Sequence, residues 1–239
     1  MQIPPYEHPV WQSQQGMRPG GLDITAQALS LCGLQPGARI LDVGCGAGAT
    51  LRFLTTPRTG TGTTPQYGLA GFGVDISTAL LRRAQDGSLA GFTQANAEQL
   101  PFANDSLDAV ISECALSIFD ADAALRECHR VLKPGGCLMV SDLYARDETG
   151  LPALRSLPAG TSFGSVMPRA AIESKLAGVG LQLSIWQDCS EKLKEFPVCS
   201  LSTAAQVDVF DLIIVAGKAK LGYYWLVARK GSTWTSLNN

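Results

Sequence analysis

The sequence predicts an α/β fold in which helices cover both faces of a mostly parallel sheet. Short apolar segments alternate with segments of helical periodicity along most of the chain. The apolar segments are hydrophobic at nearly every position, which is typical of strands buried on both faces. A glycine-rich turn also joins the first strand to the helix that follows it, as in doubly wound sheets.

The individual elements follow from the same patterns. Apolar residues at helical spacing predict a first helix over 22–32, which ends at Gly33. We expect a turn at 133–136 and a long exposed loop over 55–66, which is rich in Thr, Gly and Pro. Residues 190–220 give no clear pattern, and we expect one helix in their first half. The remaining predicted elements are strands at 38–43, 69–74, 91–94, 106–112, 137–143, 181–186 and 222–228, and helices at 49–54, 78–85, 121–132 and 168–178.

Composition and charge exclude several classes of function. The 239 residues are 46% hydrophobic and 17% charged, which fits one globular domain. Nineteen Lys and Arg against 21 Asp and Glu leave no basic surplus, so we expect no nucleic-acid partner. No apolar run approaches the roughly 20 residues of a membrane span, and no signal peptide is visible. Seven scattered cysteines do not form a disulfide framework, so we expect a cytoplasmic protein.

The strongest chemical signal is the turn Leu-Asp-Val-Gly-Cys-Gly-Ala-Gly at 41–48. Gly44, Gly46 and Gly48 allow positive φ angles and place no Cβ between the backbone and a ligand. The helix that starts immediately afterwards directs its free N–H groups to the same place. The turn is therefore expected to bind an anionic or carboxylate-bearing ligand at the carboxyl ends of the strands.

Two cofactor classes use such a turn. The Gly-x-Gly-x-x-Ala pattern at 44–49 satisfies the dinucleotide fingerprint. Asp42 argues against it, because a carboxylate beside this turn repels a diphosphate but attracts an ammonium group. S-adenosylmethionine carries an ammonium, a carboxylate and a sulfonium but no phosphate, so Asp42 favours S-adenosylmethionine. Asp75, at the end of the second strand, suits ribose hydroxyls under either interpretation.

Two further motifs follow the glycine turn and Asp75: Asn-Ala-Glu-Gln-Leu-Pro-Phe at 96–102 and His-Arg-Val-Leu-Lys-Pro-Gly-Gly at 129–136. With these four features in this order, the chain resembles the class I S-adenosylmethionine-dependent methyltransferases of the small-molecule branch. The resemblance implies a Rossmann-like sheet of seven strands whose last strand is antiparallel. It also implies a cofactor-binding core at 34–144, a part at 145–239 that completes the sheet, and an arm or lid at 1–19. The cofactor-binding residues that it implies are Asp42, Gly44, Cys45, Gly46, Gly48, Asp75, Ile76, Asn96, Ala97, Glu98 and Glu113.

The acceptor side is expected after the fourth and fifth strands. Methyl transfer mainly requires an aligned nucleophile and exclusion of water, so no general base is obligatory. Glu113, Cys114 and Tyr144 are the candidate catalytic residues, and Asp142 and Arg146 are further candidates for the wall of the pocket. Glu113 is the best of them, because its carboxylate at a strand end suits a sulfonium cofactor.

The arm and the cysteines give two further expectations. Tyr6, His8, Trp11 and Arg18 make the arm aromatic and basic, as in a lid that closes over a site. Three cysteines, Cys114, Cys189 and Cys199, are the ones that could share a pocket, but no C-x-x-C pair is present. We therefore expect no metal site.

The resulting hypothesis is an S-adenosylmethionine-dependent methyltransferase that acts on a small molecule by in-line displacement. A homodimer is compatible with this hypothesis. Two alternatives stay open at this point: an NAD-dependent oxidoreductase, and a non-catalytic domain that keeps the fold for binding. No tyrosine is followed four residues later by a lysine, a pair common in the oxidoreductases.

Overall fold

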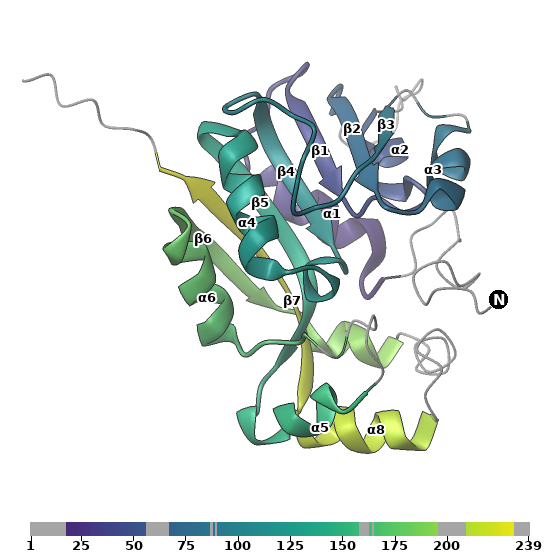
Figure 1. Ribbon diagram of the computed structural model, residues 1–239, viewed down its shortest axis with the longest axis vertical. Coiled ribbons are helices and arrows are strands. Elements are labelled where there is room, and N and C mark those ends of the chain that lie inside the picture. Colours follow the sequence, from purple (N-terminus) through teal and green to yellow (C-terminus); the bar gives the residue numbers. More distant parts are fainter. Residues whose placement is uncertain are drawn as a thin grey trace, which may run out of the picture.

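The computed structural model describes residues 18–55, 67–86, 88, 90–157, 163, 165–195 and 209–231. A seven-stranded sheet lies at its centre, in the order β3-β2-β1-β4-β5-β7-β6 (Figure 1). β7 is antiparallel to both of its neighbours, and the other pairs are parallel. The predicted fold class is therefore confirmed, including the antiparallel last strand. The strands are β1 (Arg39–Val43), β2 (Ala70–Asp75), β3 (Gly91–Gln94), β4 (Leu107–Glu113), β5 (Leu132–Ala145), β6 (Leu181–Asp188) and β7 (Leu221–Lys230).

The order of the strands fixes where a ligand site can form. From β1 the chain passes to β2 and β3 on one side, and then returns to β4 on the other side of β1. In open α/β sheets, ligands bind in the crevice outside the carboxyl ends of the strands at this reversal. The glycine turn directly follows β1, so it lies at that crevice.

Helices cover both faces of the sheet (Figure 1). One large apolar cluster joins α1 to one face, and a second joins α4 and α6 to the other. A smaller group, α5 and α8, lies beyond the carboxyl ends of β5 and β6 (Figure 1). The helices are α1 (Gly21–Ser30), α2 (Ala49–Thr55), α3 (Thr78–Gln85), α4 (Ala121–Val131), α5 (Leu151–Arg155), α6 (Arg169–Gly178) and α8 (Val209–Lys218), and the 3-10 helices are η3 (Leu116–Ile118), η4 (Glu148–Gly150) and η5 (Ser190–Glu195).

The structure differs from the predicted elements in one place, and another prediction falls largely outside the described residues. We expect one helix in the first half of 190–220; of that half the structure describes 190–195, which form η5, and α8 is a helix in the second half. The sequence of α8, Val-Phe-Asp-Leu-Ile-Ile-Val-Ala, is rich in β-branched and apolar residues, which favour a buried strand as well as a helix, so the pattern did not identify this helix. The turn expected at 133–136 lies inside β5, where the register shifts so that Leu107 pairs with Leu132 and Ala109 with Cys137. Most of the predicted loop at 55–66 lies outside the described residues.

Candidate functional site

The glycine turn after β1 adopts the left-handed backbone that its sequence requires. Gly44, Gly46 and Gly48 have φ angles of 77°, 52° and 76°. The amides of Gly44 and Cys45 both donate to the carbonyl of Val74 on β2, at 2.9 and 3.0 Å. The turn is thus fixed to the neighbouring strand, and its curvature depends on residues without a Cβ.

The three glycines serve different purposes. A Cβ on Gly44 would lie 2.7 Å from the Cβ of Ala115, and one on Gly48 would lie 3.0 Å from Phe92. These two positions are therefore needed for close packing within the protein. A Cβ on Gly46 would have no described atom within 4 Å, so this residue faces the open crevice.

Two carboxylates flank the turn. Asp75 accepts hydrogen bonds from the amides of Gly46 and Ser77, both at 2.9 Å, one on each carboxylate oxygen. Asp42 is 3% exposed. Burial, reinforced by the carboxylates of Glu113 and Asp75, raises the pKa of Asp42 well above its ordinary value. A cation that enters this region would favour the ionised form of Asp42.

The loop after β3 lies beside Asp75, since the Ala95 amide donates to the Asp75 carbonyl at 3.1 Å. Asn96 accepts from the amide of Glu98 at 3.1 Å through its side-chain oxygen. Glu98 in turn accepts from the amide of Asp120, just before α4, at 3.1 Å. Ala97 is buried, whereas Ile76 is 49% exposed at the end of β2 and leaves an apolar surface open.

Arg130 on α4 holds the far part of the same loop. Its guanidinium donates to the carbonyls of Leu100 at 2.9 Å and Phe102 at 2.7 Å, and to the Asn104 side chain at 2.9 Å. The guanidinium also forms two 2.7 Å contacts with Glu127, whose carboxylate accepts from the Leu100 amide. The sequence analysis missed this contribution, although Arg130 lies in a motif that it quoted.

Glu113, at the end of β4, is the centre of a buried polar cluster. Its carboxylate is 2.9 Å from Arg18 and accepts from Thr25 of α1 at 2.7 Å and from Thr50 of α2 at 2.6 Å. The side chains of Arg18 and Glu113 are only 7% and 4% exposed. Arg18 Nε has no hydrogen-bond partner among the described residues, although it is buried. The cluster therefore joins the segment before α1 to the cofactor side of the sheet.

The remaining candidate residues lie on different faces of the sheet. Cys114 packs against the cluster on the α1 face, where its sulfur is 3.2 Å from the Tyr223 hydroxyl. Burial raises the pKa of the Cys114 thiol to about 12, so it is protonated at neutral pH. Tyr144 belongs to the opposite cluster and donates to Asp188 at 2.9 Å. These two candidate catalytic residues therefore lie on opposite faces of the sheet and not side by side.

Asp142 and Arg146 are held by structural contacts. Asp142 is buried and accepts from the amide and the hydroxyl of Ser117, at 2.8 and 2.9 Å, which fixes η3 to β5. Arg146 donates to the carbonyl of Lys220 at 2.9 Å, in the turn before β7.

No three His, Cys, Asp or Glu side chains of the described residues are grouped so that they could hold a metal ion. Cys189 is buried, and burial raises the pKa of its thiol to about 12. Cys199 lies outside the described residues, as do Tyr6, His8 and Trp11 of the predicted arm. Arg18 is the one arm residue named above that the structure describes.

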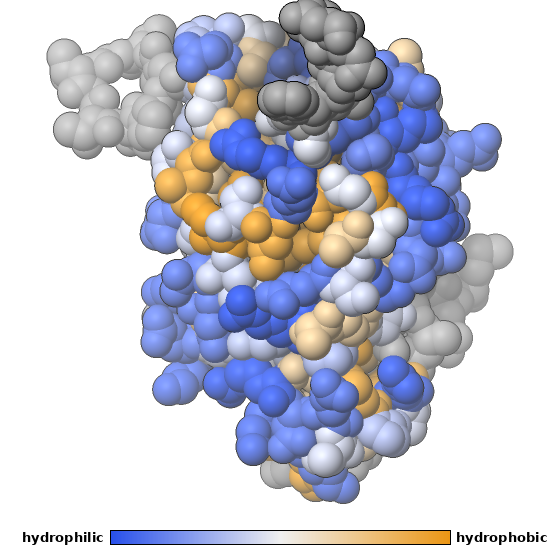
Figure 2. All heavy atoms as spheres, turned by 90° about the vertical axis from the view of Figure 1, so that its left-hand side faces the viewer, coloured by the Kyte–Doolittle hydropathy of each residue, from blue (hydrophilic) through white to orange (hydrophobic). Residues whose placement is uncertain are grey.

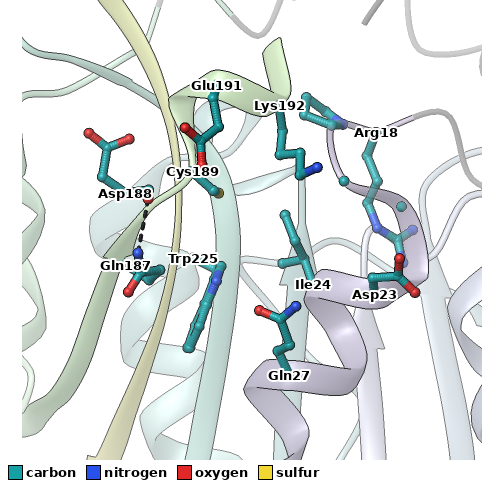
Figure 3. Close-up of a pocket in the computed structure, with 13 residues that line it drawn as sticks. Arg18, Asp23, Ile24, Gln27, Gln187, Asp188, Cys189, Glu191, Lys192 and Trp225 are labelled. Atoms are coloured by element: carbon teal, nitrogen blue, oxygen red, sulfur yellow. Dashed lines mark hydrogen bonds between the residues drawn. The ribbon is translucent and has the colours of Figure 1, made fainter. Parts of the chain in front are cut away.

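A cavity of about 590 Å³ lies beside the Glu113 cluster, between α1 and η5 (Figure 3). Its walls come from the start of α1, the end of β6, the start of η5, and Trp225 of β7. Arg18 belongs to its lining and also contacts Glu113, so it lies between the cavity and the end of β4.

The family model of a methyltransferase domain matches residues 41–140. The ubiquinone/menaquinone biosynthesis C-methyltransferase UbiE of Vibrio parahaemolyticus is 40% identical over 117 residues, which cover 45% of this chain and 42% of that protein. The matched part thus spans less than half the length of this relative. These matches confirm the predicted family for this part of the chain, which is a class I S-adenosylmethionine-dependent methyltransferase domain.

Solved structures share the fold at lower identity. A putative sarcosine dimethylglycine methyltransferase from Galdieria sulphuraria has a TM-score of 0.70 at 18% identity, over 87% of this chain and 84% of that one. The [4+2]-cyclase SpnF has a TM-score of 0.64 at 22% identity, over 88% of this chain and 80% of that one. The two alternatives, an oxidoreductase and a non-catalytic domain, receive no support from the matches. Of the helices that the structure describes, none is long and apolar enough to cross a membrane.

Proposed function

We propose that this protein transfers the methyl group of S-adenosylmethionine to a small-molecule acceptor. The observation that carries the proposal is the turn after β1. Gly46 has a positive φ angle and faces open space, and its amide binds the carboxylate of Asp75 at 2.9 Å. The turn therefore fixes the orientation of Asp75 at the edge of an open crevice at the sheet reversal.

The nucleoside end of the cofactor fits the side of the crevice near β2 and β3. The carboxylate oxygens of Asp75 accept the amides of Gly46 and Ser77, and a carboxylate accepts several hydrogen bonds, so this group suits the hydroxyls of a ribose. Ile76 offers an exposed apolar side chain for the adenine ring. Asn96 and Ala97 would border that ring, because their loop is attached to Asp75 through the Ala95 amide.

The amino-acid end fits the buried charges near β1 and β4. Arg18 Nε is a buried donor with no partner among the described residues, and such a donor costs free energy unless a ligand satisfies it. We assign it to the carboxylate of the cofactor, and Asp42 to the ammonium group. Glu113 then acts as a positioning residue, because its carboxylate already binds Arg18, Thr25 and Thr50.

When bound, S-adenosylmethionine supplies a methyl carbon whose bond to the positive sulfur breaks as the lone pair of the acceptor attacks in line, which leaves the electron pair on sulfur. The protein has to hold the acceptor about 3 Å from that carbon and exclude water. Cys114 and Tyr144 remain our candidates for the acceptor side. Burial keeps Cys114 a neutral thiol that does not serve as a base, and Tyr144 donates to the carboxylate of Asp188 at the end of β6.

Calorimetric titration with S-adenosylmethionine, S-adenosylhomocysteine and NAD tests the assignment of the cofactor. We expect the first two to bind, and Asp42→Asn to weaken them. Since a raised pKa means that Asp42 takes up a proton well above the ordinary range, the affinity of the wild type should fall as the pH decreases through that pKa. The variant should not show this pH dependence. Binding of NAD alone would contradict the proposal.

A binding test does not establish the reaction, because one fold supports several chemistries. SpnF, which shares the fold, is described as a [4+2]-cyclase. Incubation with S-adenosylmethionine and pools of metabolites therefore has to yield S-adenosylhomocysteine. Failure to form it with any pool would favour a role in which the cofactor is bound but not consumed.

We also propose a single domain in the cytoplasm that binds no nucleic acid. The six cysteines that the structure describes as free thiols are consistent with a reducing compartment. A homodimer remains a hypothesis. On the side of the molecule that faces the viewer in Figure 2, apolar surface gathers in patches between hydrophilic side chains, and size-exclusion chromatography with light scattering would show whether two copies associate.

A further inference from the structure

The cavity between α1 and η5 lies at the same edge of the sheet as the cofactor crevice. Trp225 on β7 is in register with Ser141 on β5, and Ser141 is in register with Glu113 on β4. Neighbouring strands are about 4.8 Å apart, so Trp225 lies about 10 Å along the edge from Glu113. The volume of about 590 Å³ is in the range of small-molecule sites.

The charges in the lining favour a positive ligand. Asp23, Asp188 and Glu191 contribute three carboxylates, against the two cations Arg18 and Lys192. Arg18 is neutralised by Glu113, which is not part of the lining. With that pair set aside, three negative charges face one positive charge, a net charge of −2. A phosphate or carboxylate ligand would be repelled, and an ammonium group attracted.

Asp188 keeps its charge despite its contacts. Burial raises the pKa of Asp188, but hydrogen bonds from Ser190 and Tyr144 outweigh this effect and hold the pKa below its ordinary value. The amide and hydroxyl of Ser190 and the hydroxyl of Tyr144 all donate to this carboxylate. A carboxylate stabilised in this way remains ionised at neutral pH.

The N-terminus of α1 adds a positive contribution to the field in the cavity, which is smaller than that of the carboxylates. Gly20 precedes the helix without a side-chain cap, and the first turn of the helix belongs to the lining of the cavity. The helix dipole corresponds to roughly half a positive charge there. The net charge of −2, which already includes Asp23 of this first turn, exceeds that half charge. The net field in the cavity is therefore negative.

Apolar side chains complete the lining. In Figure 3 the indole of Trp225 stands opposite Ile24 and Gln27 of α1, with the cavity between them. An aromatic ring next to carboxylates is a combination that binds organic cations, through the face of the ring and through charge. Gln27 and Gln187 add amide groups that can orient a polar substituent.

We propose that this cavity binds the methyl acceptor, and that the acceptor is an amine with a flat apolar part. The lone pair of its neutral nitrogen attacks the methyl carbon, and the electron pair of the broken carbon–sulfur bond stays on sulfur. The nitrogen then carries the positive charge that the carboxylates of the lining stabilise. The inference rests on the proposed function. Arg18 links the two sites, because it lines the cavity and binds the residue at the end of β4. The family match covers residues 41–140, whereas the lining comes from residues 18–27, 187–192 and Trp225, which all lie outside it. The choice of acceptor thus lies in the part of the chain that the family match leaves out.

Three probes that share a benzyl or phenyl group but differ in charge test the selectivity: benzyltrimethylammonium, benzyl alcohol and benzoate. Their affinities are measured by calorimetry with the full chain, both free and loaded with S-adenosylhomocysteine. We expect the cation to bind at least about tenfold more tightly than benzoate at low ionic strength, with a difference that shrinks as salt is added. Equal or tighter binding of benzoate would overturn the proposal.

Variants locate the site. Trp225→Leu should reduce the preference for the cation without abolishing it, because the carboxylates remain, and Asp23→Asn and Glu191→Gln should each reduce it about threefold. Asp86→Asn, an exposed aspartate outside the cavity lining, is the matched control and should retain the full preference. Retention of the full preference in Trp225→Leu and in both charge variants would place the cation elsewhere and refute the assignment.

Turnover assays distinguish a failure of the acceptor proposal from a failure of the proposed function. We expect S-adenosylhomocysteine to form with a pool of amines, and benzyltrimethylammonium to inhibit competitively with respect to the amine. Turnover confined to a pool of carboxylic acids would refute the acceptor class and leave the methyltransferase assignment intact. Absence of S-adenosylhomocysteine binding by the wild type would instead refute the proposed function, and the probe affinities of the free protein would still report on the cavity.

Discussion

Replacement of Arg130 by glutamine tests whether α4 positions the loop beside the adenine site. The wild-type guanidinium makes three hydrogen bonds to that loop, to Leu100, Phe102 and Asn104, besides its pair with Glu127. Glutamine is shorter and cannot reach these groups together. Arg130 is 32% exposed, so water partly replaces the lost contacts. At about 0.7 kcal/mol for each of the three, the loss of stability is about 2 kcal/mol.

For a chain of this size, a loss of about 2 kcal/mol lowers Tm by roughly 4–8 °C. Arg169→Gln is the matched control. It removes an i,i+4 pair with Glu173 whose side chains are 54% and 37% exposed, and such pairs contribute about 0.3–0.5 kcal/mol. It also removes the contact of the guanidinium with the Trp186 ring, 5.0 Å from its centroid, which contributes about 0.5 kcal/mol at an exposed site. Thermal unfolding followed by circular dichroism compares the two variants. Equal shifts of Tm in both would refute our interpretation of the Arg130 contacts.

A second assay distinguishes positioning from stability alone. Measured well below Tm, Arg130→Gln should weaken 5′-methylthioadenosine and S-adenosylhomocysteine by the same factor, about threefold to tenfold, because both ligands carry adenosine. Asp42→Asn should weaken only S-adenosylhomocysteine, because 5′-methylthioadenosine has no ammonium group. Unchanged affinity of folded Arg130→Gln for both ligands would show that the loop holds its shape without the guanidinium.

Three further outcomes follow from the structure. Gly46→Val should abolish binding of S-adenosylhomocysteine in calorimetry, because its side chain enters open space at the crevice and its backbone has a φ angle of 52°; retained binding would mean that the turn faces something else. Asp75→Ala should weaken the same ligand by about 1.5–3 kcal/mol, the loss expected for hydrogen bonds to a charged group, and unchanged affinity would contradict the placement of the ribose. Burial raises the pKa of the Cys128 thiol to about 12, so its unfolded form ionises first as the pH rises above about 9 and stability is lost. The unfolding free energy of the wild type, relative to Cys128→Ala, should therefore fall by about 1.5 kcal/mol between pH 8 and pH 10 in denaturant titrations, and a constant difference would show that the thiol ionises normally.

The sequence was sufficient for the features that depend on local patterns. The strands, the sheet and the glycine turn follow from residues adjacent in the chain, and the structure confirms their order. Even there, the sequence did not show that the three glycines have different roles. An added Cβ on Gly44 would meet Ala115 and one on Gly48 would meet Phe92, and these neighbours come from distant segments of the chain. Only Gly46 faces the crevice.

The role of Glu113 could not be inferred from its neighbours in the chain. A carboxylate at the end of a strand suggests contact with a cofactor, but its actual partners, Arg18, Thr25 and Thr50, come from 63 or more positions away. Thr25 and Thr50 lie in helices, where a buried threonine hydroxyl needs a partner, and both are at most 3% exposed.

The cofactor side could be predicted from the sequence and the cavity could not, and the reason is physical and concerns the function. The cofactor side is built from successive strand ends and the turns that follow them, so its pattern is readable and the family model matches it up to residue 140. The cavity is built from the start of α1, the end of β6 and the middle of β7, which packing brings together without any local motif. Substitutions in the cavity lining can therefore change the acceptor without disturbing the turn or Asp75. The exception is Arg18, which belongs to both sites, so Arg18→Gln should weaken S-adenosylhomocysteine and alter the selectivity of the cavity together, whereas Glu191→Gln should alter only the latter.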